Sequence, residues 1–264
     1  QISTRVLPFR FLIFKMDKKS QIISIENAVF ESLSHINQLN DLFKFIEDDE
    51  TDIVVAGVNS IQKLFQYLLQ EKDVIKLEIS DSGKLLEQSD VSGDEAVLSN
   101  FLVKKFSIFL DALNRLLTQG AEVTLQILGM KGSIFITKVL FLHLNEKEGL
   151  EVARDKLVLL FGRIISSILI SETTETTLLD SFVEKYIRKF RDVGLITLEC
   201  LKSLIQVSQF RNPEMYRRFY HFMSVCPECE EVKDANYYAR TSEEGQKIAH
   251  LYNQDTYESD WKLS

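Results

Sequence analysis

The sequence predicts an all-α fold, an irregular α-solenoid of antiparallel helical hairpins similar to HEAT and armadillo repeats. Apolar residues recur at the i, i+3, i+4 and i+7 positions of one helix face through most of the 264-residue chain. The chain has three prolines and ten glycines, and no proline lies between Pro8 and Pro213, so little interrupts long helices. The hairpins follow one another at roughly forty residues, as in these repeats. Because they are not alike in sequence, we expect an irregular array.

The repeat domain is predicted to cover residues 16–225. Residues 1–15 are apolar and basic, and we expect a non-native or disordered leader, with Met16 as the natural start. Arg10 interrupts the apolar run and no small-residue cleavage site follows, which argues against a signal peptide. Residues 226–264 are polar and acidic without a sustained period, so we expect a polar tail or a linker to an absent C-terminal half.

The first hairpin is predicted from two apolar stripes. Residues 24–46 and 53–71 each keep helical spacing. The acidic segment 47–52 between them is predicted to be a turn, whose charge is favourable at the N-terminus of the second helix. Residues 76–94 are rich in Ser, Asp and Gly, and we expect a polar loop that is disordered or lies on the surface.

Three long helices are predicted next, at residues 95–118, 121–144 and 150–170. The second is apolar on all sides and contains Gly129 and Gly132. Each of these glycines costs about 1 kcal/mol relative to alanine in a helix interior. The β-branched run that follows them could also form a strand, but no partner strand is predicted, so a helix is favoured.

Residues 178–208 form two more amphipathic helices joined by a very short turn. Such a turn predicts that the helices lie antiparallel and bury their apolar stripes against each other. The two stripes consist of Leu179, Phe182, Val183, Tyr186 and Phe190, and of Val193, Ile196, Cys200, Leu204 and Val207. A short helix is predicted to begin at Pro213, with Asn212 as its N-cap.

Composition excludes several classes of protein. A net charge of −8 and a pI of about 5.2 argue against a protein whose whole surface binds phosphate, but they allow a local basic patch. The three cysteines provide no disulfide framework and favour a reducing compartment. No apolar run reaches the ~18 residues of a membrane span, so we expect no membrane contact.

The sequence contains no pattern that predicts an enzyme or a bound cofactor. The histidines are scattered without a nucleophile or a carboxylate cluster near them, and no Gly-rich phosphate loop is present. Cys226 and Cys229 form a CxxC pair, to which His221 could add a third zinc ligand. Two unligated thiols at a helix end are the favoured interpretation, because a second ligand pair and the βαβ context of a redox motif are both missing.

A set of basic residues is the candidate binding site. Its members are Lys185, Arg188, Lys189, Arg191, Arg211, Arg217 and Arg218. If the repeats bring them to one edge, they would form a patch for RNA phosphates or an acidic partner segment. A solvated helix end is the favoured alternative, because cations near a helix C-terminus also complement the helix dipole.

The order of these features resembles a known family. An LF-x₂-LL helix end at residues 64–69 precedes the polar insertion, and an F-x₃-Y-x₃-F helix with Phe182, Tyr186 and Phe190 comes later, followed by Asp192. This arrangement resembles the N-terminal half of the nucleolar complex protein four family, within the wider CCAAT-binding-factor-like family. The similarity covers most of the predicted repeat domain. An arginine before Asp192 departs from the family pattern.

The resemblance implies a non-enzymatic scaffold of small-ribosomal-subunit assembly, located in the nucleolus and nucleus. It implies nucleolar protein fourteen as a partner and association with the pre-ribosomal particle, including contact with pre-ribosomal RNA. No small-molecule substrate is implied. The family's contact with that partner lies largely in the C-terminal half, so no partner-binding residue is carried over to this chain.

Two other functions fit the residues alone. A generic α-solenoid adaptor in trafficking or transport would bind a peptide in its groove and would be cytoplasmic. A zinc module around His221, Cys226 and Cys229 would contain stoichiometric metal.

Overall fold

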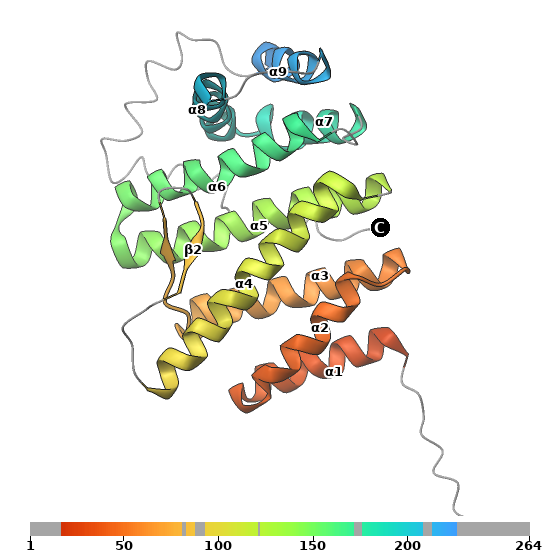
Figure 1. The fold of residues 1–264 in the computed structure, drawn as a ribbon, viewed down its shortest axis with the longest axis vertical. Coiled ribbons are helices and arrows are strands. Elements are labelled where there is room, and N and C mark those ends of the chain that lie inside the picture. Colours follow the sequence, from red (N-terminus) through yellow and green to blue (C-terminus); the bar gives the residue numbers. More distant parts are fainter. Residues whose placement is uncertain are drawn as a thin grey trace, which may run out of the picture. The chain divides into compact units, whose positions relative to one another are not determined.

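The computed structural model describes residues 17–80, 83–87, 93–120, 122–171, 176–207 and 213–225. Helices make up nearly all of the described secondary structure (Figure 1), and the predicted all-α helical-repeat fold is confirmed. The chain divides into two compact units, residues 1–60 and 61–264. The expected leader 1–15 and tail 226–264 lie outside the described residues and stay predictions.

The first unit contains α1 (Lys18–Glu31), the 3₁₀ helix η1 (Leu33–Gln38), α2 (Leu39–Ile46) and the beginning of α3 (Thr51–Gln66). The predicted continuous helix over residues 24–46 is wrong, because Ser32 is extended, with φ −155° and ψ 132°, and ends α1. The Ser32 hydroxyl accepts a hydrogen bond from the Ser34 backbone N–H at 3.2 Å. Serine side chains compete in this way for backbone groups that a continuous helix would pair internally.

The acidic turn between α2 and α3 contacts the start of α1. Lys18 Nζ lies 2.9 Å from an Asp48 carboxylate oxygen and 2.7 Å from one of Glu50. Asp52 lies in the first turn of α3, where negative charge is favourable. The predicted acidic turn is therefore confirmed, and it also pairs with a helix that precedes it.

In the second unit, α4 (Asp94–Gln119), α5 (Val123–Glu148) and α6 (Leu150–Ile170) are close neighbours. The bounds of α6 agree with the prediction, and those of α4 and α5 differ from it only at the ends. Figure 1 shows α5 between α4 and α6. The ring of Phe65, at the end of α3, lies 4.6 Å from that of Phe106 and 5.7 Å from that of Phe109, measured between centroids. All three side chains are fully buried. Such aromatic pairs add to the stability that burial alone provides.

Helix α5 is buried on nearly all sides, which explains its apolar sequence. By length and composition it could cross a membrane, whereas no segment of the sequence was expected to reach that length. In the structure, 78% of its most apolar window is buried. That burial is what a core helix shows.

The two glycines of α5 lie where neighbouring groups come very close. A Cβ atom at Gly129 would lie 2.5 Å from the Leu117 nitrogen and 2.6 Å from the Leu113 carbonyl oxygen, both backbone atoms of α4. A Cβ atom at Gly132 would lie 2.6 Å from Gln62 Nε2. The helix-propensity cost of these glycines is therefore accompanied by a close approach that a side chain would prevent.

The expected polar loop at residues 76–94 contains a small β-hairpin that follows the π-helical turn η2 (Tyr67–Glu71). Strands β1 (Glu78–Ile79) and β2 (Leu85–Leu86) pair antiparallel. The sequence left two alternatives for this segment, disorder or a surface loop, and neither included the hairpin that its described part forms. Ile75, Leu77 and Ile79 are buried at alternate positions, a period-2 pattern that the polar composition had obscured.

The remaining helices are α7 (Thr176–Phe182), the π-helical turn η3 (Val183–Ile187), α8 (Arg191–Val207) and α9 (Pro213–Val225). The structure differs from the predicted antiparallel pairing of the two helices in residues 178–208. Helix α8 packs chiefly on α6 and meets the preceding segment at η3; Figure 1 shows it nearly end-on, whereas α6 runs across the view. Leu195, Thr197 and Leu201 are buried besides the predicted stripe, so α8 is buried on more than one side.

A buried histidine in α5 predicts a pH-dependent stability. Burial lowers the pKa of His143 below its ordinary value of 6.5, and the nearby Asp73 carboxylate only partly offsets this. His143 therefore binds a proton more readily in the unfolded chain than in the folded protein. The contribution of neutral His143 to stability is complete above pH 6.5 and is lost as the pH falls through its folded-state pKa. We expect the free energy of unfolding, measured by urea denaturation, to fall below pH 6.5.

The substitution His143→Gln should flatten this pH dependence. His35→Gln, at an exposed position of η1, is the matched control and should leave the slope unchanged. An unchanged slope in His143→Gln would show that other groups cause the dependence.

Candidate binding surfaces

Three of the predicted basic residues lie together on the surface. Lys185 belongs to η3, and Arg188 and Lys189 follow it directly; all three are exposed. Arg188 forms an ion pair with Glu184, one helical turn earlier. The Lys189 ammonium lies 5.6 Å from the centroid of the Phe190 ring. This basic cluster, Lys185, Arg188 and Lys189, is the part of the predicted patch that the structure gathers.

The other predicted cations do not all join this cluster. Arg217 is exposed in α9, and its guanidinium lies 3.8 Å from the Glu214 carboxylate. Arg211 and the side chain of Arg191 lie outside the described residues. The prediction is wrong for Arg218, which is buried and cannot reach an RNA phosphate on the surface.

Arg218 contacts the end of α6 instead. Its Nη1 donates hydrogen bonds to the carbonyl oxygens of Ile168, at 3.2 Å, and Leu169, at 3.3 Å, and to that of Ser171. These carbonyls belong to the last turn of α6 and its C-cap, where the helix leaves acceptors unpaired. Burial lowers the pKa of the guanidinium, which remains charged at neutral pH because the ordinary value is so high.

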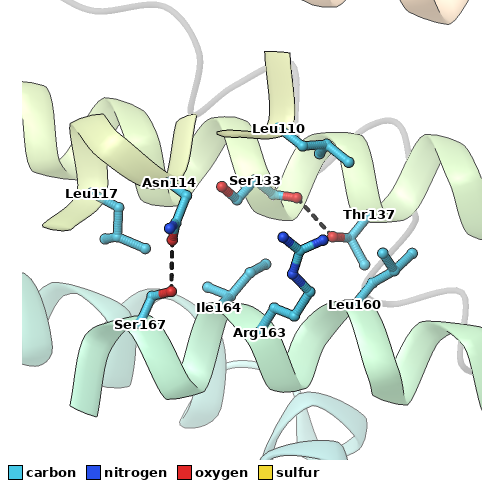
Figure 2. A pocket seen from close by; sticks show the side chains of 9 residues that line it. All are labelled: Leu110, Asn114, Leu117, Ser133, Thr137, Leu160, Arg163, Ile164 and Ser167. Carbon is cyan, nitrogen blue, oxygen red and sulfur yellow. Dashed lines mark hydrogen bonds between the residues drawn. The ribbon is translucent and has the colours of Figure 1, made fainter. Parts of the chain in front are cut away.

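The structure also contains a pocket that the sequence analysis did not predict. Figure 2 shows it between α4, α5 and α6. Its cavity volume is about 60 Å³. It is lined by Leu110, Asn114, Leu117, Ser133, Thr137, Leu160, Arg163, Ile164 and Ser167. Ser133 and Thr137, two hydroxyl residues four positions apart in the mainly apolar helix α5, are the sequence signal that could have indicated a polar site there.

Polar side chains from all three helices converge on this pocket. The Ser167 hydroxyl donates to Asn114 Oδ1 at 2.6 Å, which joins α6 to α4. The Thr137 hydroxyl donates to the Ser133 carbonyl oxygen at 2.8 Å, and Figure 2 shows the guanidinium of Arg163 directed toward these two residues. Arg163 Nη1 also donates to the Gly83 carbonyl oxygen at 3.2 Å, in the turn of the β-hairpin.

The structure provides no support for a metal site within the part of the chain it describes. Among those residues, no group of three or more His, Cys, Asp or Glu side chains could hold a metal ion. His221 Nε2 lies 3.6 Å from an Asp180 carboxylate oxygen. Cys226 and Cys229 lie outside the described residues, so the zinc module stays a prediction. Cys200 is buried in α8, and burial raises the pKa of its thiol to about 12.

Comparison with known proteins supports the resemblance found in the sequence. The family model described as nucleolar complex protein 4-like, TPR repeats, matches residues 14–210. No curated protein and no solved structure matches the chain. TPR repeats are helix–turn–helix units, so the match names the type of repeat more closely than the predicted HEAT or armadillo comparison. The match covers well over half of the chain and indicates a nucleolar scaffold of ribosome biogenesis: the chain belongs to the nucleolar complex protein 4-like family of TPR-repeat proteins.

Proposed function

We propose that this protein is a non-enzymatic scaffold that acts in assembly of the small ribosomal subunit. The observation that carries the proposal is the family match over residues 14–210, which includes α1 to α8. Helical repeats suit such a role because they present extended surfaces to several partners at once. We further propose nucleolar protein fourteen as a partner and the precursor particle as the site of action.

The basic cluster is proposed to contact pre-ribosomal RNA. Lys185, Arg188 and Lys189 are exposed on a protein of net charge −8, so they provide a local site for phosphate. Each phosphate contact that a cation makes adds to the salt dependence of RNA binding. An RNA contact through the cluster would therefore weaken steeply as salt rises.

Reversing the charge of the cluster is expected to release the protein from ribosomal precursors. In the full-length protein, K185E/R188E/K189E should lower the recovery of precursor RNA by about tenfold or more, given that phosphate contacts dominate such affinity. The measurement is RNA quantification after affinity purification at two salt concentrations.

A matched control reverses the same number of charges elsewhere. K44E/K104E/K202E changes three exposed lysines on α2, α4 and α8 and should retain the precursor RNA. Equal recovery for both triple variants would contradict the proposed RNA contact.

The proposed function itself is tested by affinity purification of the full-length protein from cells and identification of the co-purifying proteins and RNA. Small-subunit precursor RNA together with nucleolar protein fourteen is the expected result. Recovery of vesicle, transport or cytoskeletal proteins instead would overturn the proposal and favour the adaptor function.

A further inference from the structure

We propose that the pocket between α4, α5 and α6 binds the acidic side chain, glutamate in the first place, of a protein partner. This inference rests on the proposed scaffold function, because it assigns to the scaffold a specific site for one partner residue. The pocket is distinct from the basic cluster at η3, which belongs to a different part of the second unit.

Three side chains on the polar side of the pocket carry hydrogen-bond donors: Arg163, Asn114 and Ser133. The hydroxyls of Ser167 and Thr137 already donate to Asn114 and to the Ser133 carbonyl oxygen, so they add no donor. Arg163 supplies a guanidinium, which has five N–H donors in a planar fork that suits a carboxylate. The Asn114 Oδ1 is engaged by the Ser167 hydroxyl, so the same amide presents its two N–H donors on Nδ2. Ser133, which is buried, adds a hydroxyl to the lining. A carboxylate can accept from these groups; the lining contains no acidic side chain, and Asp111 lies just outside it, near Arg163.

The apolar side of the pocket suits the rest of an acidic side chain. Leu110 and Leu117 of α4 and Leu160 and Ile164 of α6 form this side. Burial of methylene groups against such a surface is favourable, because it removes apolar area from water. Glutamate has one more methylene than aspartate, so the lining favours glutamate.

The size of the pocket selects a side chain over other ligands. A cavity of about 60 Å³ has room for a few water-sized groups, such as the end of one side chain. An RNA phosphate is linked to its chain on two sides and fits a small space between helices less well than a side chain, which is linked on one. The pocket therefore fits a protein partner, and RNA is the outcome that would contradict this.

A carboxylate of the protein itself, that of Asp111, lies near Arg163. Arg163 Nη2 lies 3.8 Å from an Asp111 carboxylate oxygen, a loose pair in which the Asp111 side chain is 71% exposed. Asp111 repels an incoming carboxylate and competes for the same guanidinium. Removal of its charge should therefore strengthen binding, in contrast to removal of the Arg163 charge.

The experiment is site-specific photo-crosslinking in the full-length protein in cells. An aliphatic diazirine residue replaces Leu110, a half-buried residue of similar size that lines the pocket. After irradiation, the crosslinked partner peptide is identified by mass spectrometry. The expected product contains a glutamate or aspartate whose replacement by glutamine or asparagine lowers the crosslink yield.

Single substitutions in and near the pocket should change the crosslink yield in opposite directions. Arg163→Gln should lower the yield by about tenfold or more, since a hydrogen bond to a charged group contributes ~1.5–3 kcal/mol. Asp111→Asn should raise the yield. Lys156→Gln is the matched control, because Lys156 also donates from α6 to a hairpin carbonyl, that of Ile79, but does not line the pocket. It should leave the yield unchanged.

If Arg163→Gln fails to fold, Asn114→Leu takes its place in the test. This substitution removes the N–H donors of the Asn114 amide and leaves the contact between Arg163 and the hairpin in place. Crosslinks to RNA, crosslinks that do not depend on an acidic residue, or no crosslink above background would overturn the inference. If precursor RNA still co-purifies in that case, only this inference fails. If precursor RNA is absent as well, the proposed function fails with it.

Discussion

Replacement of Gly129 by alanine is expected to lower the free energy of unfolding by about 2–3 kcal/mol, the range of a severe overpacking in a core. The added Cβ would lie 2.5 Å from the Leu117 nitrogen and 2.6 Å from the Leu113 carbonyl oxygen. Both are backbone atoms of α4, so relief requires that α4 and α5 move apart rather than that one side chain rotates. The measurement is urea denaturation followed by circular dichroism.

Gly162→Ala is the matched control, in the middle of α6. Its Cβ would lie 3.6 Å from Cys200 Sγ, an ordinary van der Waals distance. Helix propensity then decides the result, and we expect a gain of about 1 kcal/mol. A gain in Gly129→Ala as well would contradict the close approach of α4 and α5, because the two substitutions are identical in their effect on helix propensity.

Arg218→Met is expected to lower the free energy of unfolding by about 2–4 kcal/mol, since charge-assisted hydrogen bonds are lost and buried carbonyls are left unpaired. The affected acceptors are the carbonyl oxygens of Ile168, Leu169 and Ser171 at the end of α6. Methionine keeps much of the apolar stem of arginine, so the substitution mainly removes the guanidinium. Thermal denaturation and protease sensitivity of α9 would report the loss.

The adjacent arginine provides the control. Arg217→Met changes a residue whose side chain is 71% exposed and pairs with Glu214 at 3.8 Å. Exposed pairs of this kind contribute ~0–1 kcal/mol, so this variant should retain nearly full stability. Similar losses in both variants would show that Arg218 does not hold α9 against α6.

Most of the helices could be predicted from the sequence because their apolar residues keep a period near 3.6. Helix α6 agrees with its predicted range, and α4 and α5 differ from theirs only at the ends. Ser32 was missed, because a single extended residue does not disturb the periodicity that runs through it. The β-hairpin at β1 and β2 was missed because polar composition outweighed three alternating apolar residues.

The environments of the candidate binding residues could be predicted less well than the helices. Arg217 and Arg218 are neighbours in the chain and were treated alike, yet one is exposed and the other is buried on the end of α6. Successive residues on a helix point about 100° apart, so their environments depend on which side packs against a neighbour. The position and lining of the pocket could not be predicted for the same reason, since Asn114, Ser133 and Arg163 meet only when α4, α5 and α6 pack together.

Local patterns in the chain therefore establish its helical class, the approximate bounds of its long helices and its family. These properties depend on the spacing of residues near one another in the sequence, and a regular spacing survives in any arrangement of the helices. Tertiary packing alone decides that Gly129 tolerates no side chain, that Arg218 pairs with α6, and that α8 packs on α6 rather than along its predicted partner. Each of these depends on atoms from distant segments, whose distances are set by how the helices pack and not by the order of residues within any one of them.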